Sequence, residues 1–287
     1  MAGIASAATS TLLGFIAGKT SSIRIGSGGV MLPNHSSLVI AEQFGTLATL
    51  YPGRIDLGLG RAPGTDGLTA RALRRNMSQA GVDFPDQVRE LLAYLGPAQP
   101  GQTVQAVPGV NTKVPVWLLG SSTYSAELAA ELGLPFAFAA HFAPQEMMAA
   151  ISIYRSSFEP SIYLKNPHVM VGLPVLAADS DEEASYLSTT SMQRFLNLIR
   201  GRPFLLEPPV MSMDGLWTHT ERELVMSRFS AAIVGSRATV QRKLEQFFAD
   251  TNADEVIIQC EPYEQSARLH SFEIAAEVMK SLEFATV

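Results

Sequence analysis

Short apolar runs alternate with segments of helical periodicity along most of this 287-residue chain, and this alternation constrains its fold most strongly. Runs such as residues 116–119 and 256–258 are apolar throughout, which is typical of strands covered on both faces in parallel sheets. The sequence predicts six strands, at residues 23–30, 54–60, 115–120, 135–140, 168–178 and 255–260. Such a βα repeat predicts an α/β fold with a parallel sheet and right-handed crossovers.

The segments between the strands place apolar residues on one face of a helix. The predicted faces are Ile4, Ala8, Leu12, Phe15 and Ile16; Ile40, Phe44, Leu47, Ala48 and Tyr51; Tyr124, Leu128 and Leu132; Val240, Leu244, Phe247 and Phe248; and Leu269, Phe272, Ala276 and Met279. A closed (β/α)8 barrel needs eight strands, whereas an open doubly wound sheet accepts six. Periodicity alone therefore favours the open sheet.

Two excursions interrupt the repeat, and no linker divides the chain, so we expect one domain over residues 1–287. Residues 61–113 contain predicted helices at 68–75 and 84–95 and a Pro/Gly/Gln-rich connection at 96–109. Residues 201–220 are rich in Pro and Met. Long excursions of this kind act as lids or binding loops, or as plain surface or dimer-contact loops.

Composition excludes several classes of partner. Lys and Arg number 21 against 27 Asp and Glu, a net charge of −6 that disfavours nucleic acid and anionic membranes. No apolar run approaches the roughly 20 residues of a membrane span, and the apolar run at 11–18 lacks the preceding basic residues of a signal peptide. The single cysteine, Cys260, cannot form an internal disulfide, which predicts a cytoplasmic protein. The five histidines lack metal-ligand spacing, so no metal site is expected.

One arginine follows a predicted strand directly. The run at residues 58–64 superficially matches the dinucleotide fingerprint G-x-G-x-x-G, but its third glycine comes one residue late and Pro63 interrupts the helix start. Arg61 lies at the carboxyl end of its strand, where α/β folds place ligands, and a guanidinium there suits phosphate. The alternative is a surface arginine that bonds a loop carbonyl.

Hydroxyl-bearing residues join another predicted strand to its helix, in the sequence Gly-Ser-Ser-Thr-Tyr-Ser at 120–125. Hydroxyl groups and free N–H groups at a helix N-terminus form an anion site. Ser121 or Ser122 could equally be a simple N-cap. Together with Arg61, these two serines predict a phosphate clamp across neighbouring strands.

Two further features stand at strand ends. Gly26, Gly28 and Gly29 end the first strand, where glycine permits either a plain bulge or a close approach to a flat ligand. His141 follows the strand at 135–140 and is a weak candidate for catalysis, because a lone histidine there more often has a structural hydrogen bond.

Six runs of the chain, at residues 23–35, 41–44, 51–64, 114–122, 132–139 and 253–258, closely resemble the bacterial-luciferase-like flavin monooxygenases, in particular their YhbW-type subgroup. The resemblance covers essentially the whole chain. It implies a (β/α)8 barrel that uses reduced FMN and O2 to insert one oxygen into a small organic substrate. It also implies a separate flavin reductase and a homodimer. Some members use F420 instead of FMN. No residue of the sequence identifies the substrate.

The resemblance also assigns roles to particular residues. It implies that Gly28 and Gly29 form a non-prolyl cis peptide under the flavin ring, and that Arg61 binds the phosphate. By the same resemblance Gly120, Ser121 and Tyr124 belong to the phosphate loop, and Ser122 lies within it. Ala140 and His141 fall where family members approach the face of the ring.

One departure from the family concerns the N-terminus. The family begins with a strand, a helix and a second strand ending in Glu-His-His, which carries the catalytic histidine, whereas Met1 here stands almost directly before the matching segment 3–10. We therefore expect an incomplete barrel lacking its first two strands, and the catalytic residue stays unknown. Three alternatives are open: a truncated monooxygenase, a flavin-binding protein without oxygenase activity, and an aldolase-like phosphate-binding enzyme. The last lacks a Schiff-base lysine at a strand end.

Overall fold

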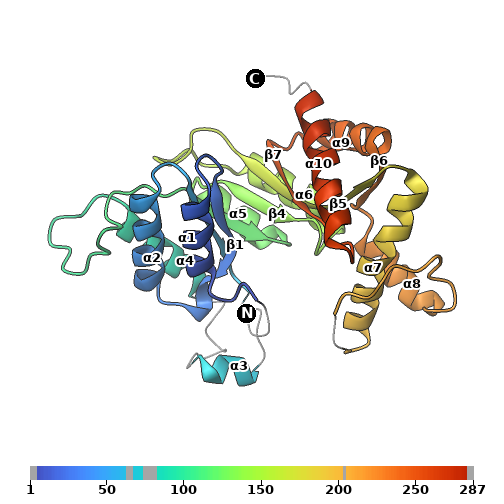
Figure 1. Ribbon diagram of the computed structural model, residues 1–287. Coiled ribbons are helices and arrows are strands. Elements are labelled where there is room, and N and C mark those ends of the chain that lie inside the picture. Colours follow the sequence, from blue (N-terminus) through green and yellow to red (C-terminus); the bar gives the residue numbers. More distant parts are fainter. Residues whose placement is uncertain (1–4, 63–66, 74–82, 203–204, 283–287) are drawn as a thin grey trace. The chain divides into compact units, whose positions relative to one another are not determined.

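The computed structural model describes residues 5–62, 67–73, 83–202 and 205–282. They form two compact units, in which strands alternate with helices (Figure 1). Unit 1 is Met1–Ala137 with Ser152–His168, and unit 2 is Phe138–Ile151 with Val169–Val287. The single domain expected over residues 1–287 stays a prediction.

Unit 1 contains the first three strands and the helices between them. In chain order its elements are α1 (Thr9–Lys19), β1 (Ile25–Met31), the 3-10 helix η1 (Leu32–Asn34), α2 (Ser37–Leu50), β2 (Ile55–Gly60), α3 (Gly67–Ala72), α4 (Phe84–Leu95), β3 (Val116–Gly120) and α5 (Thr123–Glu131). Strand β2 pairs in parallel with β1 and with β3. The boundary between the units crosses β4 (Phe136–Ala139) and α6 (Met147–Ser156).

The core of unit 1 follows the predicted pattern. Ile40, Phe44 and Leu47 are buried on α2, as their spacing predicts, and Leu57 and Leu59 of β2 are fully buried. Burying each such side chain contributes about 1.5–3 kcal/mol. The predicted strands at 23–30, 54–60 and 115–120 are present within one or two residues as β1, β2 and β3.

Unit 2 is built around one long strand. Its elements are the 3-10 helix η2 (Pro144–Glu146), β5 (Val169–Ala178), α7 (Asp181–Ile199), α8 (His219–Arg228), β6 (Ile233–Ser236), α9 (Arg237–Thr251), β7 (Glu255–Gln259) and α10 (Gln265–Ser281). Strand β5 pairs in parallel with β7 along residues 170–174 and with β6 along residues 175–178. The predicted strands at 135–140, 168–178 and 255–260 correspond to β4, β5 and β7. The sequence did not predict β6, because its run of four residues includes Gly235.

The predicted faces of two helices were wrong. On α1, Leu13 and Ala17 are buried while Leu12 and Phe15 are exposed, and Ile4 of the predicted face lies outside the described residues. On α10, the buried residues are Ser271, Ile274, Ala275 and Val278, whereas Leu269 and Phe272 are exposed. Both helices carry apolar residues around much of their circumference, so periodicity does not select the face that packs.

The two excursions contain ordered structure. Helix α4 matches its predicted range of 84–95, and α3 matches the described part of the helix predicted at 68–75, since residues 74 and 75 lie outside the described residues. In the second excursion, side chains of α7 hold the loop: Thr190 donates to Glu207 O and Gln193 donates to Pro208 O, both at 2.9 Å. Among the helices of the described ranges, none has the length and apolarity that a membrane crossing requires.

Candidate functional site

Strand β1 carries a bulge at its glycines. Ser27 pairs with Leu57 and Val30 pairs with Leu59, so β1 has one residue more than β2 over this stretch. The extra length falls at the peptide bond between Gly28 and Gly29, which is cis. The structure therefore contains both the bulge that the glycines permit and the cis bond that the resemblance implies.

A buried hydroxyl group holds the bulge against β2. The Ser27 Oγ donates to Gly58 O at 2.9 Å and accepts from Gly58 N at 3.0 Å. A Cβ atom on Gly29 would lie 2.8 Å from Gly58 O, whereas one on Gly28 would meet nothing within 4 Å. The backbone at Gly28 thus faces open space in which a flat group can approach it closely.

Arg61 and Tyr124 meet at the ends of neighbouring strands. Gly60 pairs with Leu119, so Arg61, which follows β2, lies beside Gly120, the last residue of β3. The guanidinium carbon of Arg61 lies 4.0 Å from the centroid of the Tyr124 ring, within the range of a cation–π contact. Arg61 is exposed and has no ion pair within the part of the chain that the structure describes. Its charge is therefore positioned by a ring and available to an anion.

Helix α5 begins directly at this point. Ser122 occupies the N-cap position with extended backbone angles (φ −146°, ψ 173°), but its side chain makes no capping hydrogen bond. The first N–H groups of a helix lack partners within the helix, so a ligand oxygen can accept them. A Cβ atom on Gly120 would lie 2.5 Å from Ser125 Oγ, so glycine allows the helix to start immediately after the strand.

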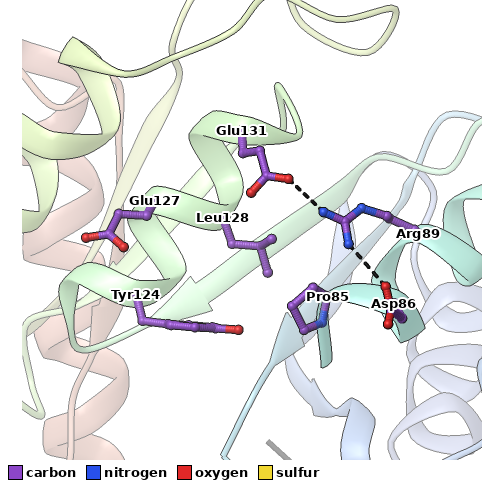
Figure 2. Close-up of a pocket in the computed structure, with 7 residues that line it drawn as sticks. All are labelled: Pro85, Asp86, Arg89, Tyr124, Glu127, Leu128 and Glu131. Carbon is purple, nitrogen blue, oxygen red and sulfur yellow. Dashed lines mark hydrogen bonds and ion pairs between the residues drawn. The ribbon is translucent and has the colours of Figure 1, made fainter. Parts of the chain in front are cut away.

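A groove of about 380 Å³ beside this point has the wrong charge for a phosphate (Figure 2). Arg89 bridges Asp86 at 3.2 Å and Glu131 at 2.6 Å, so its charge is already paired. The lining residues are Pro85, Asp86, Arg89, Tyr124, Glu127, Leu128 and Glu131. Its three carboxylates outnumber the one arginine, which makes the groove unfavourable for an anion. Of its lining residues, Tyr124 is the one that also belongs to the candidate anion site.

The remaining predicted residues lie in unit 2. Ala140 is fully buried, and His141 directly follows it. The backbone N–H of His141 donates to Gly172 O at 3.3 Å, and its Nδ1 lies 3.3 Å from the same oxygen. Burial, the largest cause, lowers the pKa of His141. The imidazole is therefore neutral at pH 7, and the tautomer protonated on Nδ1 satisfies the contact with Gly172 while leaving Nε2 as an acceptor.

The structure thus brings together some of the residues predicted to bind the cofactor. Unit 1 places Arg61, Gly120, Ser121, Ser122 and Tyr124 at the adjacent ends of β2 and β3, and the cis glycine pair lies on β1, the next strand. Ala140 and His141 belong to unit 2 and form a separate group. The sequence interpretation missed Ser27, although a hydroxyl residue between glycines at a strand end was a usable signal.

The chain also matches known proteins. Residues 2–255 match the model of a family described as luciferase-like monooxygenase. This chain belongs to the luciferase-like monooxygenase family. It is 52% identical to a luciferase-like monooxygenase of Escherichia coli (strain K12) over 98% of this chain and 84% of the relative. It is also 56% identical to YvbT of Bacillus subtilis (strain 168), over 97% of this chain and 83% of YvbT.

A similar solved structure supports the fold as well. The crystal structure of apo-MsnO8 matches 96% of this chain and 83% of its own, with a TM-score of 0.81 and 31% sequence identity. The predicted α/β fold of the luciferase-like type is therefore confirmed. This similarity favours the luciferase-like type over the open doubly wound sheet that periodicity alone favoured.

Proposed function

We propose that this chain is a flavin-dependent monooxygenase that binds reduced FMN and uses it with O2 to insert one oxygen into a small organic substrate. The observation that carries the proposal is the Arg61–Tyr124 pair, with its 4.0 Å separation, beside the N-terminus of α5. Membership of the monooxygenase family supports the reaction class.

The phosphate end of FMN fits the unit 1 site. Arg61 supplies an exposed guanidinium without an ion pair in the described residues, and a guanidinium can bind a phosphate with two parallel hydrogen bonds. The N-terminus of α5 adds N–H donors and the positive end of the helix dipole. Ser121 and Ser122 add hydroxyl groups at the same turn. These donors match a single terminal phosphate, which favours FMN.

The ring end of the flavin is assigned to the glycine pair. Space is open in front of Gly28, which suits a planar group lying against bare backbone. The resemblance also assigns Ala140, in unit 2, to cofactor binding, and it leaves His141 as a candidate for catalysis. The reduced flavin supplies the electrons that activate O2, while the chain positions it and keeps water away from the reacting atoms.

Solved proteins that share the fold hold cofactors of this class. The oxygenating constituent of 3,6-diketocamphane monooxygenase is solved in complex with FMN, at 18% identity, and a tetrahydromethanopterin reductase of the same fold depends on F420, at 15% identity. A separate flavin reductase and a homodimer belong to the proposal, as the resemblance implies them.

The experiment is a fluorescence titration of the purified chain with FMN and with riboflavin, which lacks the phosphate. Arg61→Met is expected to weaken FMN binding by roughly 10- to 100-fold, because it removes charged hydrogen bonds, and riboflavin binding by less than about threefold. Arg89→Met is the control, since it removes the same charge from the adjacent groove. Equal losses for both ligands in Arg61→Met would contradict the phosphate role.

Oxygen transfer needs its own measurement, made with a flavin reductase, NADH and a panel of thioethers, aldehydes and ketones. A monooxygenase consumes more O2 than it returns as H2O2, the difference appearing as oxygenated product. A flavin-binding protein without oxygenase activity returns all consumed O2 as H2O2. Complete recovery as H2O2 with every compound, despite tight FMN binding, would favour this alternative.

A further inference from the structure

Unit 2 contains a half-buried arginine, Arg228, whose direct contacts are with neutral groups. Arg228 ends α8, and its Nη1 donates to the carbonyl oxygen of Phe142 at 2.5 Å. Its guanidinium carbon lies 4.9 Å from the centroid of the Phe142 ring and 5.0 Å from that of Phe195. No carboxylate of the described residues pairs with it. A guanidinium has five N–H donors, and within the described ranges Arg228 uses one of them in the hydrogen bond to Phe142.

The one carboxylate near Arg228 is occupied by a different arginine. Glu261 follows β7, and its Oε2 lies 2.5 Å from Nη1 of Arg194, with both side chains about two-thirds buried. Burial, followed by the charge of Arg194, lowers the pKa of Arg228. With His141 neutral, two guanidinium groups and one carboxylate leave a net charge of +1 in this partly buried region. An anion bound there would compensate that charge.

Aromatic and apolar side chains surround the positive charge. Phe142 is 58% exposed and its ring lies 4.2 Å from that of His141. Phe195 and Phe229 are in edge contact at 6.4 Å and pack on the apolar cluster between α7 and α8, which lie against each other (Figure 1). A ligand with an apolar body beside its charged group would bury surface here.

The position of this region is fixed before any ligand binds. Gln145 Nε2 donates to Ser227 O at 2.9 Å, which ties η2 to the end of α8. The N–H of Phe142 donates to Ala139 O at 2.9 Å, at the end of β4. Preorganised donors bind an anion without the cost of ordering flexible side chains.

We propose that Arg228 is the recognition group of a binding site in unit 2 for a small organic anion, a carboxylate or sulfonate attached to an apolar body. All the contacts that support it lie within unit 2. That the anion is the acid group of the oxygenated substrate rests on the proposed function. Arg228 is then a specificity-determining residue, and a neutral analogue of the same shape binds less well.

The probe pair is 3-phenylpropanoate and 3-phenylpropanamide, which differ in charge but little in shape. Calorimetric titration without flavin is expected to show at least about tenfold tighter binding of the anion, and Arg228→Met abolishes this preference. Arg228→Lys keeps a positive charge and should retain part of the preference for the anion. Arg222→Met, which changes an exposed residue of the same helix, should leave the preference for the anion unchanged. Equal binding of the two probes by the wild type, or an intact preference in a folded Arg228→Met, would overturn the proposal.

A second measurement uses the unmodified chain, so its result does not depend on whether a variant folds. Arg228 lowers the pKa of His141 through its charge. Saturating 3-phenylpropanoate should therefore raise that pKa in an NMR titration, and the amide should not. No shift with the anion would refute the site. Because flavin is absent, failure of FMN binding would remove the proposed function and leave this result standing.

Discussion

Replacing Ser27 with alanine removes a hydroxyl group that bonds both backbone groups of Gly58 across the β1 bulge. The hydroxyl donates at 2.9 Å and accepts at 3.0 Å, and Ser27 is 8% exposed, so water has little access to replace it. An unsatisfied buried backbone group costs about 1–3 kcal/mol. With two such groups and partial relaxation, we expect Ser27→Ala to lower the free energy of unfolding by about 2–4 kcal/mol.

The assay is urea denaturation followed by circular dichroism, with the midpoint and slope fitted separately. Ser37→Ala is the matched control, because this buried hydroxyl makes one longer hydrogen bond, to Gln87 O at 3.2 Å. It should cost about 1 kcal/mol. A loss below about 1 kcal/mol for Ser27→Ala, or a loss equal to that of the control, would refute the reasoning that the hydroxyl holds the bulge.

Three further predictions concern other parts of the molecule. Gly120→Ala would place a Cβ atom 2.5 Å from Ser125 Oγ, so it should lower the melting temperature and weaken FMN binding, and adding Ser125→Gly should restore both. The bidentate hydrogen bonds from Arg200 and the N–H of Thr218 lower the pKa of Glu221 to about 2 from 4.5. Since the folded state favours the ionised form, this stabilisation is complete above pH 4.5 and disappears as the pH falls through about 2; Glu221→Gln should remove that pH dependence from acid unfolding curves. The imidazole of His141 should titrate below pH 6.5 by NMR, because burial disfavours its cation, and titration at or above 6.5 would contradict its burial.

Strand positions were predictable because uninterrupted apolar runs are typical of parallel strands. The expectation that the run at 256–258 is covered on both faces was wrong, since Ile257 of β7 is 56% exposed. The apolar signal identified β5, all of whose residues are buried or half-buried. It failed for β6, a strand of four residues whose place is set by pairing with the end of β5. Its pairing partner, β5, is distant in the chain, so no local sequence pattern predicts β6.

The carboxyl-end site was predictable for a similar reason. Arg61 directly follows one strand and Gly120 ends the next, and neighbouring parallel strands end at the same edge, so the sequence indicated that they would meet. The predicted interpretation of Ser122 as a simple N-cap was only half right, because the residue takes the cap position without the capping hydrogen bond.

By itself, then, the sequence determined the elements that depend on local pattern: the order of strands and helices, the residues at the strand ends, and the family to which they point. Only the tertiary structure decided which faces of α1 and α10 are buried, because both helices are apolar on several sides. It also decided the surroundings of Arg228, which come from the segment after β4, from α7 and from the segment after β7. Charge compensation and burial depend on neighbours far apart in the chain, and only folding brings those neighbours together.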